Sequence, residues 1–311
     1  MCYSNTSASP LIHIGYPKTA TTWFQKYFYP NMKNISIVSR NKIDYLIFNK
    51  NSFTFNGQEV KKEIYKEHKK RIVLCEERIV VDRRNCGILL VEKAQRLKKI
   101  FPDGKIVVFI RNQLDMLASQ YSQHLKSGGN YSINRYLFDS DINMAKQNFF
   151  VQYEYNYIIE KYKELFGSNN VCVFLFEDFQ NDPQGFLLEY IKRLNLETDI
   201  KEIKYQKKIN IRYKKFMIPF VRLFNTFTSV NFDSSFQKKR CLIHIPFLFT
   251  VVHFIFDQVN MFLNGNPSYI DILGERNAKI LYEFYAESNK NLVEQCPEIK
   301  RAKLERYGYP L

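Results

Sequence analysis

Four short runs of apolar, largely β-branched residues constrain the fold more than any other feature of this sequence. They are Leu11–Gly15, Arg71–Cys75, Lys105–Ile110 and Asn170–Phe176. Near-continuous hydrophobicity over about four to six residues is typical of strands buried on both faces of a parallel sheet. Stretches with helical spacing of apolar residues separate the runs, over residues 57–70, 86–101 and 113–126. The alternation predicts an α/β fold with a central parallel sheet flanked by helices.

Two proline-containing turns support this division of the chain. Pro102-Asp103-Gly104 predicts a tight turn directly before the third run. Asp182-Pro183 predicts a helix that runs to about Leu194, with Asp182 as its N-cap and the proline in its first turn.

The segment after the first run has the features of an anion-binding loop. The predicted strand ends at Gly15, Pro17 makes a turn, and a helix is expected to open near Thr21. The first backbone N–H groups of a helix lack partners and the helix dipole favours anions, so such junctions bind phosphates. Lys18 adds a full positive charge. In a Walker A loop the lysine comes at the end of the loop, whereas here it precedes the small residues.

A second candidate for phosphate binding follows the third run. Arg111 stands at the carboxyl end of that strand, where ligands bind in open α/β sheets. Ser119 comes eight residues later on a predicted helix, on a face that can look back at Arg111. A guanidinium group offers a planar fork of donors, so this pair suits a terminal phosphate.

Together these segments resemble the nucleotide site of the sulfotransferases that use 3′-phosphoadenosine-5′-phosphosulfate (PAPS). Pro17–Trp23 (PKTATTW) is similar to their 5′-phosphosulfate loop, with Ala20 in place of the glycine usual in cytosolic members, and Arg111 with Ser119 resembles their 3′-phosphate motif. The similarity to bacterial sulfotransferases continues through Phe174–Pro183, Phe284–Leu292 and Tyr307–Pro310. The resemblance implies a P-loop-like three-layer sandwich with a helical C-terminal region, and transfer of a sulfuryl group from PAPS to a hydroxyl.

The resemblance also assigns roles to residues. It implies that the 5′-phosphosulfate is held by Lys18, Thr19, Ala20, Thr21 and Thr22, and the 3′-phosphate by Arg111 and Ser119. Trp23 matches the position that packs on adenine, and packing in the protein core is the alternative. The product is then adenosine 3′,5′-bisphosphate. No metal is expected, because the sulfuryl group carries less charge than a phosphoryl group.

The general base has three candidates. Glycan-modifying sulfotransferases use a glutamate after the second strand, so Glu77 is the first choice and Glu76 the second; the alternative is a solvated acidic turn paired with Arg78. Steroid- and phenol-type members use a histidine instead, and His124 is the candidate because it follows Ser119 on the same predicted helix. The glutamates favour a carbohydrate or glycolipid acceptor by resemblance.

We expect one sulfotransferase domain over residues 1–311. It comprises a nucleotide-binding α/β core over 10–195, a helical insertion over 200–265 that covers the acceptor site or touches membrane, and C-terminal helices over 266–311 that return to the core. The insertion combines basic clusters with apolar stretches over 216–230 and 241–256. The insertion has three interpretations: buried helices, helices that lie on an anionic membrane face, or a helix that spans the membrane. The second apolar stretch is too short and too interrupted for a confident spanning helix.

Charge and composition limit which other classes of protein this chain can belong to. The formal net charge of +15 favours anionic partners, but a basic nucleic-acid-binding protein lacks support because no helix-turn-helix, RRM or finger signature is present. A P-loop small-molecule kinase stays open as an alternative, with Thr19 as its Mg²⁺-holding residue.

Six scattered cysteines without zinc or CxxC spacing predict free thiols in a reducing compartment. Residues 1–10 lack an apolar signal segment, so we expect a cytoplasmic protein, at the inner face of the membrane if the acceptor is lipid-linked.

Overall fold

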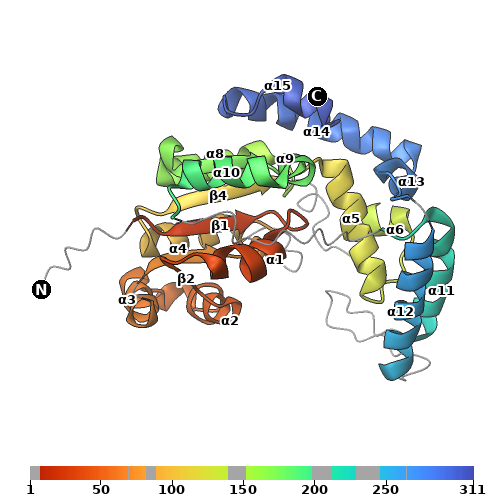
Figure 1. The fold of residues 1–311 in the computed structure, drawn as a ribbon, viewed down its shortest axis with the longest axis horizontal. Helices are drawn as coiled ribbons and strands as arrows, with labels where there is room; N and C mark the ends of the chain where they lie inside the picture. Colours follow the sequence, from red (N-terminus) through yellow and green to blue (C-terminus); the bar gives the residue numbers. More distant parts are fainter. Residues whose placement is uncertain are drawn as a thin grey trace, which may run out of the picture. The chain divides into compact units, whose positions relative to one another are not determined.

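The computed structural model describes residues 8–68, 70–81, 89–138, 152–197, 212–228, 246–263 and 265–311. The chain forms two compact units (Figure 1). Unit 1 comprises residues 1–111, 154–206 and 291–303, and unit 2 comprises residues 112–153, 207–290 and 304–311.

Unit 1 is built on a five-stranded, wholly parallel sheet with the order β2-β3-β1-β4-β5. Its strands are β1 (Leu11–Gly15), β2 (Ile35–Ile37), β3 (Arg71–Cys75), β4 (Lys105–Ile110) and β5 (Val171–Leu175). All four predicted strands are confirmed, as is the α/β class. Strand β2 was not predicted, because its three half-buried residues at the edge of the sheet are too few to give a periodic signal.

The register of the sheet brings three loops to one edge. Leu11 lies opposite both Val73 and Lys105, so β3 and β4 flank β1 in the middle of the sheet. Because the strands are parallel, the segments that follow Gly15, Cys75 and Ile110 all leave at the carboxyl edge. Ligands of open α/β sheets bind at this edge.

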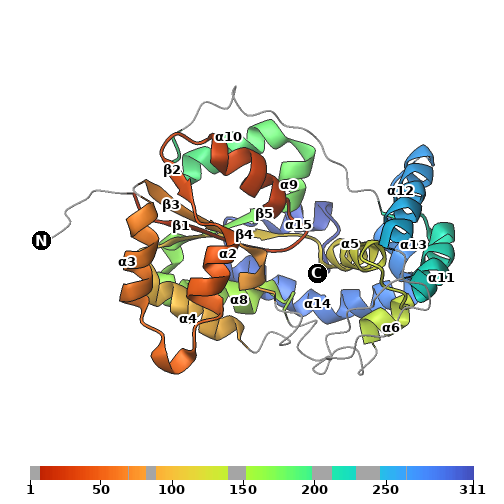
Figure 2. The ribbon, with the colours of Figure 1, turned by 90° about the horizontal axis from the view of Figure 1, so that it is seen from below.

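Helices cover both faces of the sheet (Figure 2). On one face, aromatic side chains of β4, β5 and the helical segment after β1 pack with those of two later helices, in a cluster that includes Phe24, Phe109, Phe174, Phe186 and Tyr190. The helices of unit 1 are α1 (Thr21–Trp23), which continues in a π-helical turn over Phe24–Phe28, α2 (Arg40–Ile43), α3 (Gly57–Glu67), α4 (Leu90–Ile100), α8 (Tyr155–Phe166), α9 (Phe176–Asn181) and α10 (Pro183–Leu194). The predicted three-layer arrangement is confirmed.

The predicted local signals are reproduced closely. Asp182 caps α10 by accepting a hydrogen bond from the Gly185 N–H at 2.9 Å. The predicted helix over 57–70 ends at Glu67, and residues 86–88 of the next predicted helix lie outside the described residues. Cys75, Cys172 and Cys296 are buried free thiols.

Unit 2 is helical in the part of the chain that the structure describes. It contains α5 (Gln113–Lys126), α6 (Ile133–Phe138), α11 (Ile218–Thr228), α12 (Pro246–Phe262) and α13 (Tyr269–Leu273), while α14 (Glu275–Gln295) and α15 (Arg301–Arg306) contribute residues to both units. The predicted helix over 113–126 is confirmed at both ends. The described parts of the apolar stretches 216–230 and 241–256 are helical in α11 and α12, and residues 229–230 and 241–245 lie outside the described residues. Each of the two helices exposes large apolar side chains, so the buried-helix interpretation does not hold for those side chains.

No helix in the described ranges combines the length and the apolar character that a membrane span requires. Lys204, Lys207, Lys208, Lys238, Lys239 and Arg240, which form most of the predicted basic clusters, lie outside the described residues.

Candidate active site

The loop after β1 begins at a residue that has to be glycine. Gly15 has a φ of +116°, and a Cβ there would lie 3.1 Å from the Cα of Glu77 and 3.3 Å from a methyl group of Val80. The start of the loop therefore lies directly against the turn that follows β3. We refer to these two segments, residues 15–23 and 76–78, as the sheet edge.

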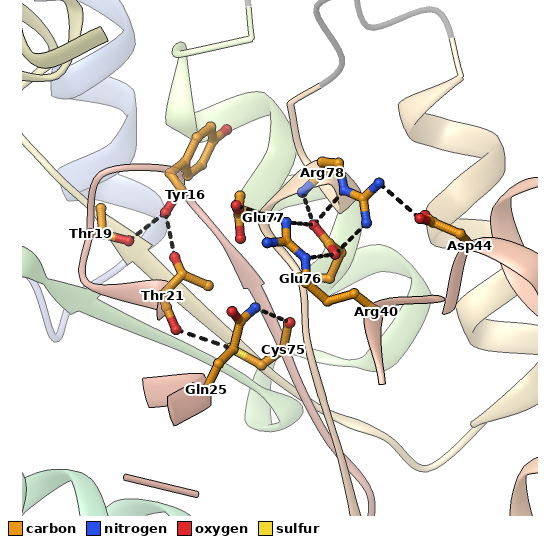
Figure 3. Close-up of polar contacts among 10 residues, drawn as sticks. All are labelled: Tyr16, Thr19, Thr21, Gln25, Arg40, Asp44, Cys75, Glu76, Glu77 and Arg78. Atoms are coloured by element: carbon orange, nitrogen blue, oxygen red, sulfur yellow. Dashed lines mark hydrogen bonds and ion pairs between the residues drawn. The ribbon is translucent and has the colours of Figure 1, made fainter. Parts of the chain in front are cut away.

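The loop is closed by its own threonines. Thr19 Oγ1 and Thr21 Oγ1 donate to the backbone carbonyl of Tyr16, at 2.5 and 3.1 Å (Figure 3). Both threonines are buried, whereas Thr22 is exposed. These two hydroxyls therefore donate within the loop itself, and the role of Thr19 and Thr21 at the 5′-phosphosulfate stays a prediction.

The backbone of the loop offers the donors instead. Within the described ranges, the N–H groups of Thr19, Ala20, Thr21 and Thr22 donate to no other group. Lys18 and Ala20 both have left-handed backbone conformations, with φ values of 63° and 64°. Glycine adopts this conformation without steric penalty, which explains why related loops place glycine where this chain has Ala20.

Arg111 lies beside this loop. Its Nη1 donates to the carbonyl of Lys18 at 3.0 Å, and its guanidinium group stacks over the ring of Phe176 at 4.9 Å. The hydroxyl of Tyr155 donates to the Arg111 carbonyl at 2.6 Å. Two segments about 90 residues apart, each predicted to bind phosphate, therefore meet within unit 1.

Ser119 belongs to unit 2, where it lies beside a buried arginine. Arg212 Nη2 donates to Ser119 Oγ at 3.4 Å and to the carboxylate and carbonyl oxygens of Asp115 at 2.5 and 3.1 Å. Arg212 was not predicted as a site residue, because nothing in the sequence spacing distinguishes it from its lysine neighbours.

Glu76 is a buried carboxylate enclosed by two arginines. It is fully buried, and its oxygens accept hydrogen bonds from the side chains of Arg40, at 2.8 and 2.9 Å, and Arg78, at 2.7 and 2.8 Å, and from the Arg78 N–H. Burial alone would raise the pKa of Glu76, but the hydrogen bonds from Arg78 and Arg40 outweigh it and hold the pKa at about 2. The alternative of a solvated acidic turn does not hold for Glu76.

Glu77 has a different environment. Arg40 Nη2, which also bonds Glu76, donates to Glu77 Oε1 at 3.0 Å. Its other oxygen, Oε2, is buried and has no hydrogen-bond partner among the described residues. Figure 3 shows Glu77 between the loop and the two arginines. Arg40 was missed because it follows β2, the strand that the sequence did not reveal.

The remaining candidates pack among aromatic rings. Trp23 is half-buried against Phe24, Phe28 and Phe179, with ring centroids 5.1 to 5.9 Å apart, as the core-packing alternative predicts. His124 lies in unit 2 and stacks on Tyr131 at 5.3 Å. His124 as a base stays a prediction. The residues that the structure describes contain no group of three or more His, Cys, Asp or Glu side chains that could hold a metal ion.

A sequence model of the sulfotransferase family matches residues 88–199, a range that contains Arg111, Ser119 and the strands β4 and β5. Over these residues, which are less than half of its length, the chain is similar to the sulfotransferase family. The matched range begins downstream of Lys18, so the match gives no support to the loop after β1. No curated protein matches this chain in a sequence search.

One solved structure at 15% identity has a similar fold. A sulfotransferase from Alicyclobacillus acidocaldarius matches with a TM-score of 0.50 and 15% identity, over 71% of this chain and 94% of that one. The mouse sulfotransferase SULT7A1, solved in complex with PAP, has a TM-score of 0.48 and 14% identity, over 98% of this chain and 89% of that one.

Proposed function

We propose that this protein is a sulfotransferase that moves the sulfuryl group of PAPS to a hydroxyl of a carbohydrate or glycolipid, with Glu77 as general base. One observation carries the proposal. The Cα and Cβ of Glu77 lie against Gly15, the first residue of the Lys18 loop, and one carboxylate oxygen of Glu77 accepts from Arg40 while the other is buried without a partner among the described residues. An acceptor hydroxyl is the kind of group that would satisfy the second oxygen.

The nucleotide assignment draws on the loop and on Arg111. The loop supplies backbone N–H donors and the charge of Lys18, and Arg111 adds a second cation within hydrogen-bonding distance of the Lys18 carbonyl. An adenosine with phosphate groups at both its 5′ and 3′ positions needs two such cation centres. By resemblance, Ser119 is proposed as a hydroxyl ligand of the 3′-phosphate.

The proposed reaction is an in-line displacement with a loose transition state, like phosphoryl transfer. The acceptor oxygen bonds to sulfur while the bond between sulfur and the bridging oxygen of the 5′-phosphosulfate breaks. Glu77 Oε2 takes the proton of the acceptor hydroxyl. Lys18 stabilises the negative charge that develops on the bridging oxygen, which leaves with adenosine 3′,5′-bisphosphate.

Glu76 is the weaker candidate for the base. Hydrogen bonds from two arginines occupy both of its oxygens, and they hold its pKa at about 2, far below the range in which a carboxylate accepts a proton efficiently near neutral pH. We assign Glu76 a positioning role, since it fixes the Arg40 that in turn holds Glu77.

The kinase alternative finds less support in the loop. A kinase would use Thr19 as a ligand of Mg²⁺, but Thr19 is buried and its hydroxyl donates to the Tyr16 carbonyl. Adenosine 3′,5′-bisphosphate and ATP–Mg²⁺ can be compared directly by calorimetry, because a kinase has no use for a 3′-phosphate.

The acceptor class rests on the resemblance, and we place the enzyme in the cytoplasm, acting at the inner face of the membrane on lipid-linked acceptors. The test is transfer of radiolabelled sulfate from PAPS into separated glycolipid and polysaccharide fractions. Label in either fraction, lost in the Glu77→Gln variant, supports the proposal. Label only in small phenols or steroids would contradict the acceptor class, and no label in any fraction would contradict the activity.

A further inference from the structure

Helices α11 and α12 of unit 2 bury polar side chains on their inner side and expose large apolar side chains to solvent. In α11, Asn225 is fully buried, and its side-chain amide donates to the carbonyls of Leu125 and Gly129, both at 2.8 Å. On α12, His253 faces inward and lies 2.8 Å from the Asn225 side-chain oxygen. Polar groups therefore fix which way both helices face.

The outward sides carry large apolar residues instead. They are 41 to 85% exposed and comprise Phe216, Phe220, Leu223 and Phe227 at α11 and Phe247, Phe254, Ile255, Val259, Met261 and Phe262 on α12. We call this set the apolar face. The α11 residues recur at intervals of three and four, which places them on one side of the helix. On α12, Ile255 and Phe262 stand two positions after the buried His253 and Asn260, about 200° around the helix axis.

The packing of α11 and α12 buries only the inner side of each helix. Asn260 accepts from the Lys214 N–H and donates to the Arg212 carbonyl, both at 2.9 Å, so α12 is tied to the segment that leads into α11. The two helices lie side by side (Figures 1 and 2). A contiguous exposed patch of this kind marks an interaction site.

The charges near the apolar face are basic. Lys215, next to Phe216, is exposed, and Arg222 lies on α11. Two described carboxylates of unit 2 are engaged: Asp257 pairs with Lys126 at 2.8 Å, and Asp271 accepts from Ser268. Exposed apolar residues flanked by basic ones are the composition of helices that lie in a lipid headgroup region.

We infer that the apolar face of α11 and α12 docks on an anionic lipid surface, with both helices lying along it. This inference deepens the proposed function. It rests on that function in one respect only, since a lipid-linked acceptor is the reason for the enzyme to bind a membrane. Along its 17 residues α12 would cover about 25 Å of membrane surface. A second copy of the chain is the weaker occupant, because each copy carries a net charge of +15 and the flanking basic groups would repel one another.

The test is co-sedimentation of the full chain with vesicles of phosphatidylcholine alone or of equimolar phosphatidylcholine and phosphatidylglycerol. We expect binding to the anionic vesicles and at least about ten-fold weaker partitioning of the Leu223→Ser, Phe254→Ser, Phe262→Ser triple variant. The matched control carries Tyr45→Ser, Phe53→Ser and Leu188→Ser, three exposed apolar residues of unit 1, and should bind like the wild type.

Circular dichroism melting establishes that each variant is folded. Absence of wild-type binding to anionic vesicles, or equal binding by the triple variant, would overturn the inference. So would light scattering that shows a wild-type dimer and a monomeric triple variant, since a second copy would then cover the face. None of these measurements uses PAPS, so the docking surface and the sulfotransferase reaction fail or succeed separately.

Discussion

The sheet edge of unit 1 and the α11–α12 pair of unit 2 place their polar groups in opposite ways. At the sheet edge an aromatic and aliphatic core lies under the charges, and Glu76, Glu77, Arg40 and Arg78 form a connected network. In the helix pair, Asn225 and His253 lie inside, while other apolar side chains, among them Phe220 and Phe254, are exposed.

The difference shows what each arrangement is suited to do. A hydrogen-bonded network around one buried carboxylate, Glu76, fixes side chains in position and leaves a chosen atom, here Glu77 Oε2, for chemistry. An outward apolar surface held by internal hydrogen bonds does no chemistry but can bind a surface. Variants of the two regions should therefore affect different measurements.

The largest effect is expected for Glu77→Gln. Loss of a general base lowers turnover by about 10²–10⁴-fold, while the affinity for adenosine 3′,5′-bisphosphate should stay unchanged, because the residue is proposed to face the acceptor. Steady-state kinetics and calorimetry measure the two quantities, with Glu63→Gln on the exposed side of α3 as control. Near-normal turnover would move the role to Glu76 or His124.

Lys18→Ala should lower turnover by about 10³-fold, near the upper end for removing one group that stabilises developing charge. The effect should be greatest for acceptors whose transfer is limited by departure of the nucleotide. Lys26→Ala, an exposed lysine on the helical turn that follows, should retain full activity. Equal rates for Lys18→Ala and Lys26→Ala would remove the loop from the mechanism.

Glu76→Gln should act on stability. The pKa of Glu76 falls from its ordinary 4.5 to about 2 on folding, so the charged group contributes about 3 kcal/mol at neutral pH. Because the folded pKa is the lower one, this stability is present above pH 4.5 and is lost as the pH falls towards 2. Urea unfolding should show that the wild type loses free energy of unfolding between pH 7 and pH 3 and that the Glu76→Gln variant lacks this loss.

The matched control for that variant is Glu67→Gln, which removes an exposed carboxylate paired with Lys42. Its unfolding midpoint should equal that of the wild type at both values of pH. A Glu76→Gln protein as stable as the wild type at pH 7 would mean that the arginine network is not what holds the turn after β3.

The smallest effects are expected in the helix pair. Asn225→Leu removes buried hydrogen bonds and should destabilise the protein by about 1–3 kcal/mol, although leucine is more apolar. Leu223→Ser, two positions away on the outside of the same helix, should change the free energy of unfolding by less than about 0.5 kcal/mol. The reverse order in chemical denaturation would show that α11 faces the other way.

The sequence predicted regular elements and backbone motifs well. The four buried strands, α5 and the Asp182 cap follow from local periodicity and capping rules, and the Lys18 loop and Arg111 follow from a local motif and a strand end. Each of these depends on neighbours within a few residues along the chain.

What the sequence could not predict depends on contacts between distant residues. Arg40 contacts Glu76 only because β2 joins the sheet, and a run of three residues is too short to predict a strand. The inward turn of the Thr19 and Thr21 hydroxyls depends on the left-handed backbone at Lys18 and Ala20. The burial of Asn225 beside exposed phenylalanines reverses the usual rule by which helix faces are assigned.

The most direct test of the account is calorimetry that compares adenosine 3′,5′-bisphosphate with adenosine 5′-monophosphate. We predict that the bisphosphate binds more tightly and that Arg111→Ala weakens its binding by about 1.5–3 kcal/mol, which removes most of its advantage over the monophosphate. Equal affinities for the two nucleotides in the wild type, or an Arg111→Ala variant that still distinguishes them fully, would contradict the claim that Lys18 and Arg111 bind the two ends of one nucleotide.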